Sequence, residues 1–243
     1  MIPATSTTIL ETRGIAAAYG HAQVLFGVDV TLRAGEVVAL MGRNGAGKST
    51  TLKAIMGLVP PQAGTVTFEG QDVTGWQPYR IARLGLGYVP EERRIFTDLT
   101  VYENLEVGRK SAAGAPGKEP WSLERLFAIF PNLAEMKGRR ASAMSGGEQQ
   151  MLTIARTLMG NPHAVLLDEP SEGLAPVIVE QMADAVLAMK AQGIAVLLSE
   201  QNLYFASAVS DRAYVIEKGA IRYEGTTEDL EANDEIREAY LSV

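Results

Sequence analysis

The most chemically specific stretch of the sequence is a run of glycines that ends in a lysine and a serine. Residues 42–49 fit the pattern G-x-x-x-x-G-K-[ST], between a continuous apolar run at 37–41 and a helical stretch at 50–56. Glycines let successive backbone N–H groups turn toward a phosphate chain, and a helix N-terminus adds partial positive charge. Lys48 would reach the β- and γ-phosphates, and the Ser49 hydroxyl would hold Mg²⁺. The alternative is a Gly-rich turn that happens to end in Lys-Ser.

The context of strand and helix on either side favours the phosphate loop over that alternative. The residues predicted to bind the nucleotide here are Gly42, Asn44, Gly45, Ala46, Gly47, Lys48, Ser49 and Thr50.

Two adjacent carboxylates follow a second apolar run. Residues 164–167 end at Asp168 and Glu169, and ligands of open α/β sheets lie at the carboxyl ends of strands. Asp168 would hold Mg²⁺ directly or through water, and Glu169 would orient and deprotonate the attacking water. Alone, the pair could be solvent-facing acids before Pro170. Together with the phosphate loop it predicts the metal and catalytic side of one site.

A third element, residues 144–150, precedes a helix with an apolar face. Ser145 and Glu148 have the spacing of a capping box, in which each side chain accepts from the other residue's backbone N–H. Gly146 and Gly147 in the first turn cost up to about 1 kcal/mol each against alanine. The pattern therefore indicates that some group approaches the backbone closely there.

The surrounding elements predict an α/β fold. Residues 28–33 and 65–69 alternate between apolar and polar, which is typical of half-exposed antiparallel strands. Continuous apolar runs predict strands buried on both faces, and a helical pattern between two of them indicates a parallel sheet. These runs are 37–41, 164–167 and 194–198, with the helix at 177–190. Residues 213–224 predict a β-hairpin with its turn at Lys218-Gly219.

Residues 91–160 read as mostly helical, with a loose loop at 111–120. We therefore expect a nucleotide-binding core from 1–90 and 161–243, which includes the antiparallel strands and the C-terminal hairpin, and a helical subdomain at 91–160.

Composition excludes several classes of function. The 243 residues carry a net charge of −7, which disfavours non-specific nucleic-acid binding. The chain has no cysteine, so disulfides and thiolate metal sites are excluded, and its two histidines, His21 and His163, make a histidine zinc site unexpected. Residues 1–11 show no secretory signal, and the longest apolar runs fall far short of the ~20 residues of a spanning helix.

Residues 42–49, 145–149 and 166–170, in that order, resemble ABC transporter ATPases. The resemblance covers nearly the whole chain, and the Ser-Gly-Gly-Glu-Gln element is specific to that superfamily among phosphate-loop proteins. It implies a phosphate-loop (RecA-like) parallel-sheet core with an antiparallel β subdomain and a helical subdomain. It also implies that two subunits sandwich two ATP molecules head to tail. Ser145, Gly146, Gly147 and Glu148 would then contact the γ-phosphate bound to the opposite subunit.

The resemblance assigns further positions. Tyr19 stands where the family has an aromatic that stacks on adenine, although it could be a surface tyrosine. Glu91, where most members have glutamine, would sense Mg²⁺ and the membrane partner. Gln201 stands where most members have a histidine that contacts the γ-phosphate, and it cannot carry a proton charge. Ala175, in the loop 171–176 that crosses the dimer interface, stands where many members have aspartate.

These departures together look like one subgroup, the second (F-type) ATPase subunit of branched-chain amino acid importers of the Liv type. The resemblance implies docking on integral permease subunits at the cytoplasmic face of the inner membrane, a second ABC ATPase as dimer partner (a different one is favoured, a second copy is open), and an indirect substrate-binding protein. Alternatives are an importer for urea, amides or aromatic acids, a non-transport ABC ATPase, and a cassette without catalysis. The acidic charge and the single cassette argue against a non-transport ABC ATPase. The complete set of carboxylates argues against a cassette without catalysis.

Overall fold

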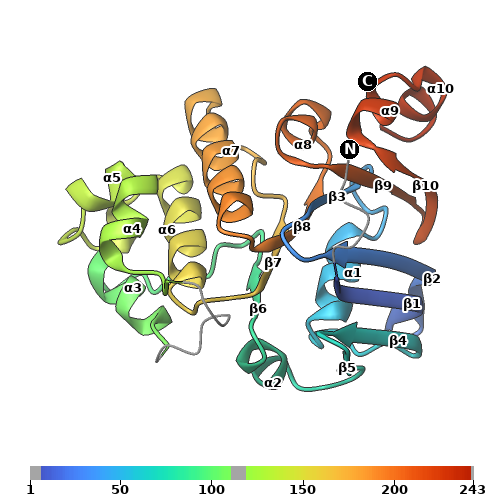
Figure 1. The fold of residues 1–243 in the computed structure, drawn as a ribbon, viewed down its shortest axis with the longest axis horizontal. Coiled ribbons are helices and arrows are strands. Elements are labelled where there is room, and N and C mark those ends of the chain that lie inside the picture. Colours follow the sequence, from blue (N-terminus) through green and yellow to red (C-terminus); the bar gives the residue numbers. More distant parts are fainter. Residues whose placement is uncertain (1–6, 111–118, 242–243) are drawn as a thin grey trace.

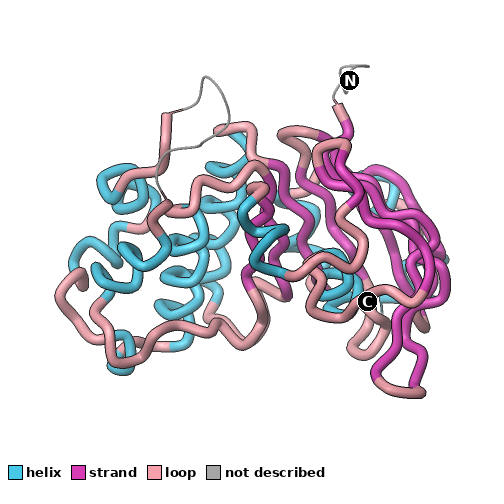
Figure 2. The backbone as a smooth tube through the Cα atoms, turned by 90° about the horizontal axis from the view of Figure 1, so that it is seen from below, coloured by secondary structure: helices cyan, strands magenta, loops and turns pink. Residues whose placement is uncertain are grey.

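A computed structural model describes residues 7–110 and 119–241 of the chain. The expected loop at 111–120 lies almost wholly outside the described residues, as do residues 1–6 of the N-terminal stretch. Strands gather at one end of the molecule and most helices at the other (Figure 2). The α/β fold class predicted from the alternating patterns is confirmed.

The centre of the fold is a six-stranded sheet in the order β10-β9-β3-β8-β7-β6. Its first five strands along the chain pair in parallel, and β10 adds an antiparallel edge as the hairpin partner of β9. The strands are β3 (Val37–Met41), β6 (Leu86–Val89), β7 (Ala164–Asp168), β8 (Ala195–Glu200), β9 (Arg212–Glu217) and β10 (Ala220–Thr226). Parallel pairing brings the carboxyl ends of β3, β7 and β8 to one edge, where a ligand can be held.

The continuous apolar runs are explained by burial of both faces of this sheet. Along β3 all five residues are buried; Val37, Ala39 and Met41 join one hydrophobic cluster and Val38 and Leu40 join the other. The first cluster includes the helical part of the chain, and the second includes the antiparallel sheet. A strand with two apolar faces cannot show the alternation of a surface strand.

The second sheet is antiparallel, in the order β2-β1-β4-β5. Its strands are β1 (Thr8–Tyr19), β2 (Ala22–Arg33), β4 (Ala63–Phe68) and β5 (Gln71–Asp72). The alternation at 28–33 matches the burial of Val28, Val30 and Leu32 on the inner face of β2. Because β2 is an edge strand, its outer backbone groups are available to neighbours.

The helices fall into two groups (Figure 1). One group between β6 and β7 is α3 (Val101–Gly108), α4 (Leu123–Ile129), α5 (Pro131–Glu135) and α6 (Gly146–Leu158), with a 3-10 turn at Ala141–Ala143. The others are α1 (Lys48–Ile55), α2 (Pro78–Arg83), α7 (Pro176–Ala191), α8 (Leu203–Val209), α9 (Thr227–Glu231), α10 (Asp234–Ile236) and a π-helical turn (Arg237–Leu241). The predicted helix at 177–190 is therefore confirmed as α7.

Candidate nucleotide-binding and catalytic site

The glycine loop connects β3 to α1 with little tolerance for side chains. Gly45 and Gly47 have φ of 78° and 113°, in the region that favours glycine. A Cβ at Gly42 would lie 2.4 Å from the Ile216 carbonyl oxygen. The glycines predicted from the motif are therefore required by the backbone of this loop.

Lys48 is almost fully buried, with 3% of its surface exposed, at the start of α1. Its Nζ donates to the carbonyl oxygens of Gly42 (2.8 Å) and Arg43 (3.2 Å). The same ammonium lies 3.0 Å from Oε1 of Glu169. The buried Lys48 ammonium thus lies between the glycine loop and Glu169, the predicted general base. Phosphate oxygens could replace its present acceptors.

Asp168 closes β7 and is oriented by the two neighbouring strands. Its Oδ1 accepts from the Ser199 hydroxyl of β8 at 2.7 Å, and its Oδ2 accepts from the Tyr88 hydroxyl of β6 at 3.1 Å. Burial and the charge of Asp168 raise the pKa of Tyr88, so this hydroxyl remains a donor. The hydrogen bonds fix the direction of the Asp168 carboxylate at the ligand edge of the sheet.

Glu169 has a left-handed backbone, with φ of 47°, and is 8% exposed. Its N–H donates to the carbonyl (3.1 Å) and hydroxyl (3.0 Å) oxygens of Ser199, which hold this unfavourable conformation. Burial raises the pKa of Glu169, but hydrogen bonds from Glu172 and Lys48 outweigh it and hold that pKa below its ordinary value. Glu169 is therefore a carboxylate, the form that a general base requires.

A small cavity of about 160 Å³ lies beside these carboxylates. It is lined by Glu91, Arg93, Gln150, Glu169 and Glu172. Burial and the charges of Glu169, Asp168 and Glu92 raise the pKa of Glu91. The structure thus brings Glu91, on the loop after β6, into one cavity with Glu169, the predicted general base.

Glu172 is a member of the site that sequence reasoning missed. Its hydrogen bond to Glu169, with burial and the charge of Glu169, raises the pKa of Glu172 to about 7. The two acids therefore share one proton near neutral pH, with the charge on Glu169. The only signal in the sequence was its position three residues after Glu169.

We expect Glu172→Gln to flatten the pH dependence of stability. Because the pKa of Glu172 is higher in the folded chain than its ordinary 4.5, its proton stabilises the fold below about pH 4.5, and this contribution is lost as pH rises through about 7. The glutamine amide stays neutral at every pH and keeps this stabilisation. The stability of the variant relative to wild type should therefore increase between pH 5 and pH 8. The gain should stay below about 1 kcal/mol because Glu172 is exposed.

Thermal melts of both proteins at pH 5 and pH 8 measure this. Glu180→Gln, an isosteric change at an exposed residue of α7, is the control and should show no such trend. If the melting temperatures of wild type and Glu172→Gln differ by the same amount at pH 5 and pH 8, Glu172 and Glu169 do not share a proton.

Gln201 follows a second buried acid that sequence reasoning also missed. Glu200 is 1% exposed and accepts from the backbone N–H groups of Gln201 and Asn202, each at 3.1 Å. Its other oxygen accepts from the Ser171 hydroxyl at 2.6 Å and the Ser171 N–H at 3.1 Å. Burial raises the pKa of Glu200 against these hydrogen bonds. Gln201 is thus placed by a carboxylate that also holds the loop after Glu169.

The Ser145 element begins α6 with the predicted capping box. The Ser145 hydroxyl accepts from the Glu148 N–H at 3.4 Å, and Glu148 Oε2 accepts from the Ser145 N–H at 2.6 Å. A group was expected to approach the backbone at Gly146 and Gly147, and part of that approach is made by residues of the same chain. A Cβ at Gly146 would lie 2.7 Å from the Arg93 guanidinium, and one at Gly147 would lie 2.9 Å from Ile178 of α7.

The structure does not place α6 beside the phosphate loop. Figure 1 shows α6 and α1 on opposite sides of β6 and β7. Tyr19 lies at the end of β1, where half of its surface is exposed. Lys48, Glu169 and Asp168 are therefore assembled within one chain; Gln150 of α6 lines the cavity beside Glu169, but α6 itself lies apart from α1.

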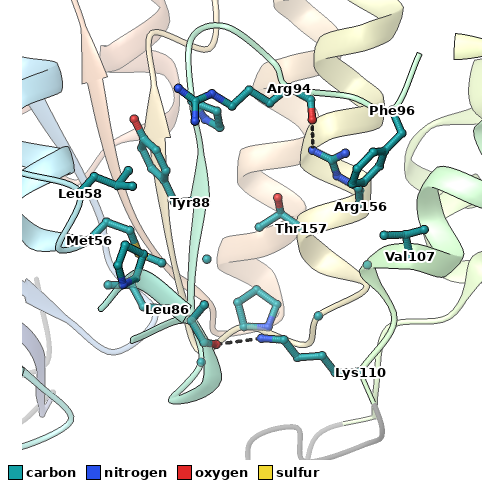
Figure 3. A pocket seen from close by; sticks show the side chains of 18 residues that line it. Met56, Leu58, Leu86, Tyr88, Arg94, Phe96, Val107, Lys110, Arg156 and Thr157 are labelled. Atoms are coloured by element: carbon teal, nitrogen blue, oxygen red, sulfur yellow. Dashed lines mark hydrogen bonds between the residues drawn. The ribbon is translucent and has the colours of Figure 1, made fainter. Parts of the chain in front are cut away.

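A larger groove of about 430 Å³ lies between the core and the helical group (Figure 3). Its walls carry apolar side chains such as Met56, Leu58 and Val107, and basic Arg94, Lys110 and Arg156. Arg156 donates to the Arg94 carbonyl at 2.7 Å, but its Nη1 is buried without a hydrogen-bond partner among the described residues. The groove thus combines an apolar surface with basic side chains, while the buried Arg156 Nη1 lies beneath that surface.

Comparison with known proteins identifies the family. The family described as ABC transporter matches residues 25–172, so the chain belongs to the ABC transporter family. Members of this family are ATPases, and this chain is an ATP-binding, ATP-hydrolysing subunit.

Three relatives show the range of the likeness. The high-affinity branched-chain amino acid transport ATP-binding protein BraG of Pseudomonas aeruginosa is 42% identical, over 92% of this chain and 95% of BraG. The lipopolysaccharide export system ATP-binding protein LptB of Haemophilus influenzae is 34% identical, over 96% of this chain and 97% of LptB. A nucleotide-free ATP-binding cassette of an ABC transporter superposes with a TM-score of 0.81 at 29% identity, over 96% and 98% of the two chains.

Among the described residues, no helix has both the length and the apolar character needed to cross a bilayer.

Proposed function

We propose that the site binds MgATP through residues 42–50 and hydrolyses it with Glu169 as general base. The observation that carries this proposal is the position of the Lys48 ammonium, which contacts the Gly42 and Arg43 carbonyls and the Glu169 carboxylate at once. A γ-phosphate that reaches Lys48 competes with Glu169 for the ammonium. Glu169 is then free to accept a proton from a water molecule beside the phosphate.

The residues present fit Mg²⁺. Ser49 and Asp168 offer the hard oxygen donors that Mg²⁺ prefers, and this ion usually takes only one or two protein ligands in addition to phosphates and water. When bound, the ion neutralises charge on the β- and γ-phosphates. Glu91 lines the same cavity as Glu169 and would offer the ion a further oxygen donor. Gln201 would donate a hydrogen bond to the γ-phosphate, and Tyr19 would stack on adenine.

We further propose that Ser145, Gly146, Gly147 and Glu148 contact ATP held by a second ABC ATPase. In support, a helix N-terminus carries partial positive charge that favours anions, and Figure 1 shows α6 apart from α1, which follows the phosphate loop of its own chain. A second subunit, either a copy or a different ATPase, would therefore complete each site, and ATP would favour the closed dimer.

For the cargo, we propose branched-chain amino acids, supported by 42% identity to BraG. A second candidate is lipopolysaccharide export, supported by 34% identity to LptB. Urea, amides, aromatic acids and a non-transport role remain as alternatives with less support. The subunit would act peripherally, at the cytoplasmic face of the inner membrane, on permease subunits and indirectly with a substrate-binding protein.

The test of the importer role is reconstitution of the chain with the permease that co-purifies with it from membranes. A leucine-loaded binding protein should stimulate MgATP hydrolysis, whereas urea- or acetamide-loaded proteins should not. Co-purification of lipopolysaccharide instead of a binding protein would support the second candidate. Hydrolysis that no membrane protein stimulates would argue for the non-transport role.

The groove of Figure 3 is the surface that we propose for the permease. Its apolar walls suit the apolar face of a short helix, and Arg94 and Lys110 suit an acidic residue on it. Docking there would place the partner next to the loop that carries Glu91. The site and the membrane subunit would then be linked through residues 91–96.

We expect Arg94→Glu to reduce co-purification of the permease by about tenfold, because a charge reversal in a partly desolvated contact costs more than about 1.4 kcal/mol. Affinity-tagged chains pulled from solubilised membranes measure this, with nucleotide affinity as a second readout. Arg13→Glu is the control, since Arg13 is an exposed arginine of β1. Equal recovery of the permease with both variants would exclude the groove.

A further inference from the structure

The turn between β9 and β10 has an unusual position for a surface hairpin. Lys218 and Gly219 have φ of 47° and 75°, the combination of a two-residue turn that matches the twist of a hairpin. The Lys218 side chain is exposed, but Gly219 is buried. The turn therefore has one residue in solvent and one against the rest of the protein.

Gly219 joins the phosphate loop to the antiparallel sheet by two backbone hydrogen bonds. Its N–H donates to the carbonyl of Ala46 at 2.8 Å, and its carbonyl accepts from the N–H of Phe26 at 2.8 Å. Ala46 belongs to the glycine loop, and Phe26 lies on the outer edge of β2. The backbone thus forms a continuous connection from β2 through Gly219 to the loop around Lys48.

The same position is sterically closed. A Cβ at Gly219 would lie 1.8 Å from the Val24 carbonyl oxygen and 2.9 Å from the Phe26 ring. One at Gly47 would lie 3.0 Å from the Leu25 side chain and 3.4 Å from the Gly219 Cα. The hairpin turn, β2 and the phosphate loop are therefore packed backbone against backbone.

We propose that Gly219 is a positioning residue for nucleotide binding, which holds the phosphate loop in register with the β2 edge of the antiparallel sheet. This inference rests on the proposed function of residues 42–50. The β1–β2 hairpin that Gly219 contacts also carries Tyr19, so one glycine aligns the phosphate-binding loop with the proposed adenine contact. Gly219 makes these contacts to the phosphate loop and to β2 through its backbone.

The sharpest test compares Gly219→Ala with Gly70→Ala. Both glycines have φ of +75°, so both alanines carry the same backbone strain, but a Cβ at Gly70 would meet no other atom within 4 Å. Gly70 lies in the exposed turn between β4 and β5. We expect Gly219→Ala to raise the Kd for ATP about tenfold or more over Gly70→Ala, since a shift of about 1 Å in a binding group has such effects.

Separate measurement of KM and kcat distinguishes a misplaced phosphate loop from general disruption of the site. Gly219→Ala should raise KM while kcat at saturating ATP stays within about threefold, because Glu169 is held by Ser199 and not by the turn. Loss of kcat without a change in KM would overturn the proposal. So would a Kd within twofold of that of Gly70→Ala.

A second pair of variants decides the matter if Gly219→Ala does not fold. Phe26→Pro removes the N–H that donates to Gly219 and places the proline ring against that carbonyl; because this N–H points away from β1, the β1–β2 hydrogen bonds are kept. Phe26→Ala removes the same ring and keeps the N–H, so the ratio of the two Kd values reports the effect of breaking the backbone contact between residue 26 and Gly219. We expect a ratio of about threefold or more, and a ratio of one overturns the proposal. If wild type binds no ATP, the proposed function fails instead.

Discussion

Glu169→Gln is expected to lower kcat for ATP hydrolysis by at least about 100-fold and to leave ATP binding intact. The amide has nearly the shape of the carboxylate but cannot accept the proton of the attacking water. It also removes the 3.0 Å ion pair with Lys48, so the ammonium no longer has to leave Glu169 to meet a phosphate. The Kd for ATP should therefore be equal to that of wild type or lower.

Phosphate release at saturating MgATP measures the first effect and calorimetric titration with ATP the second. Glu180→Gln, on the exposed side of α7, is the matched control. In gel filtration with ATP, Glu169→Gln should also accumulate the proposed dimer, because a site that cannot hydrolyse stays closed. Hydrolysis at the wild-type rate would mean that another group is the base, and Glu172 would be the next candidate.

Lys48→Met is expected to weaken ATP binding by about 100-fold or more. Each lost hydrogen bond to a charged group is worth about 1.5–3 kcal/mol, and the buried ammonium can contact both terminal phosphates. Methionine fills a similar volume, so the packing of α1 against the core should change little.

The same variant leaves Glu169 buried without its cation, which should raise the pKa of that carboxyl and lower hydrolysis beyond the loss of binding. Titration calorimetry with ATP measures the affinity. Lys53→Met, in the last turn of the same helix, is the control for loss of one lysine from α1. An affinity within threefold of wild type would remove Lys48 from the phosphate site.

The parts of the site that could be predicted from the sequence are those with local causes. Gly45 and Gly47 are required by the positive φ of their own turn, and the Ser145 capping box closes within one helical turn. Gly42 is different, because its contact is with Ile216 of β9. The double burial of β3 is likewise visible as a continuous apolar run.

The partners of Asp168 could not be predicted, because they depend on the register of neighbouring strands. Asp168 lies opposite Ser199 in the β7–β8 pairing, and Tyr88 comes from β6 on the other side. Gly219 is a similar case, because the atom that excludes a side chain there is the carbonyl oxygen of Val24, far away in sequence. Gly146 and Gly147 were expected to admit an approaching group, and in this structure Arg93 and Ile178 of the same chain lie against them.

The Glu200 carboxylate has a mechanical consequence. It accepts from Ser171 with one oxygen in a buried setting, and from the N–H groups of Gln201 and Asn202 with the other in a partly buried one. Breaking either set would strand a desolvated charge. The loop after β7, which carries Glu169, and the loop after β8 are therefore coupled through Glu200, so a displacement of one loop moves the other without a contact through the nucleotide.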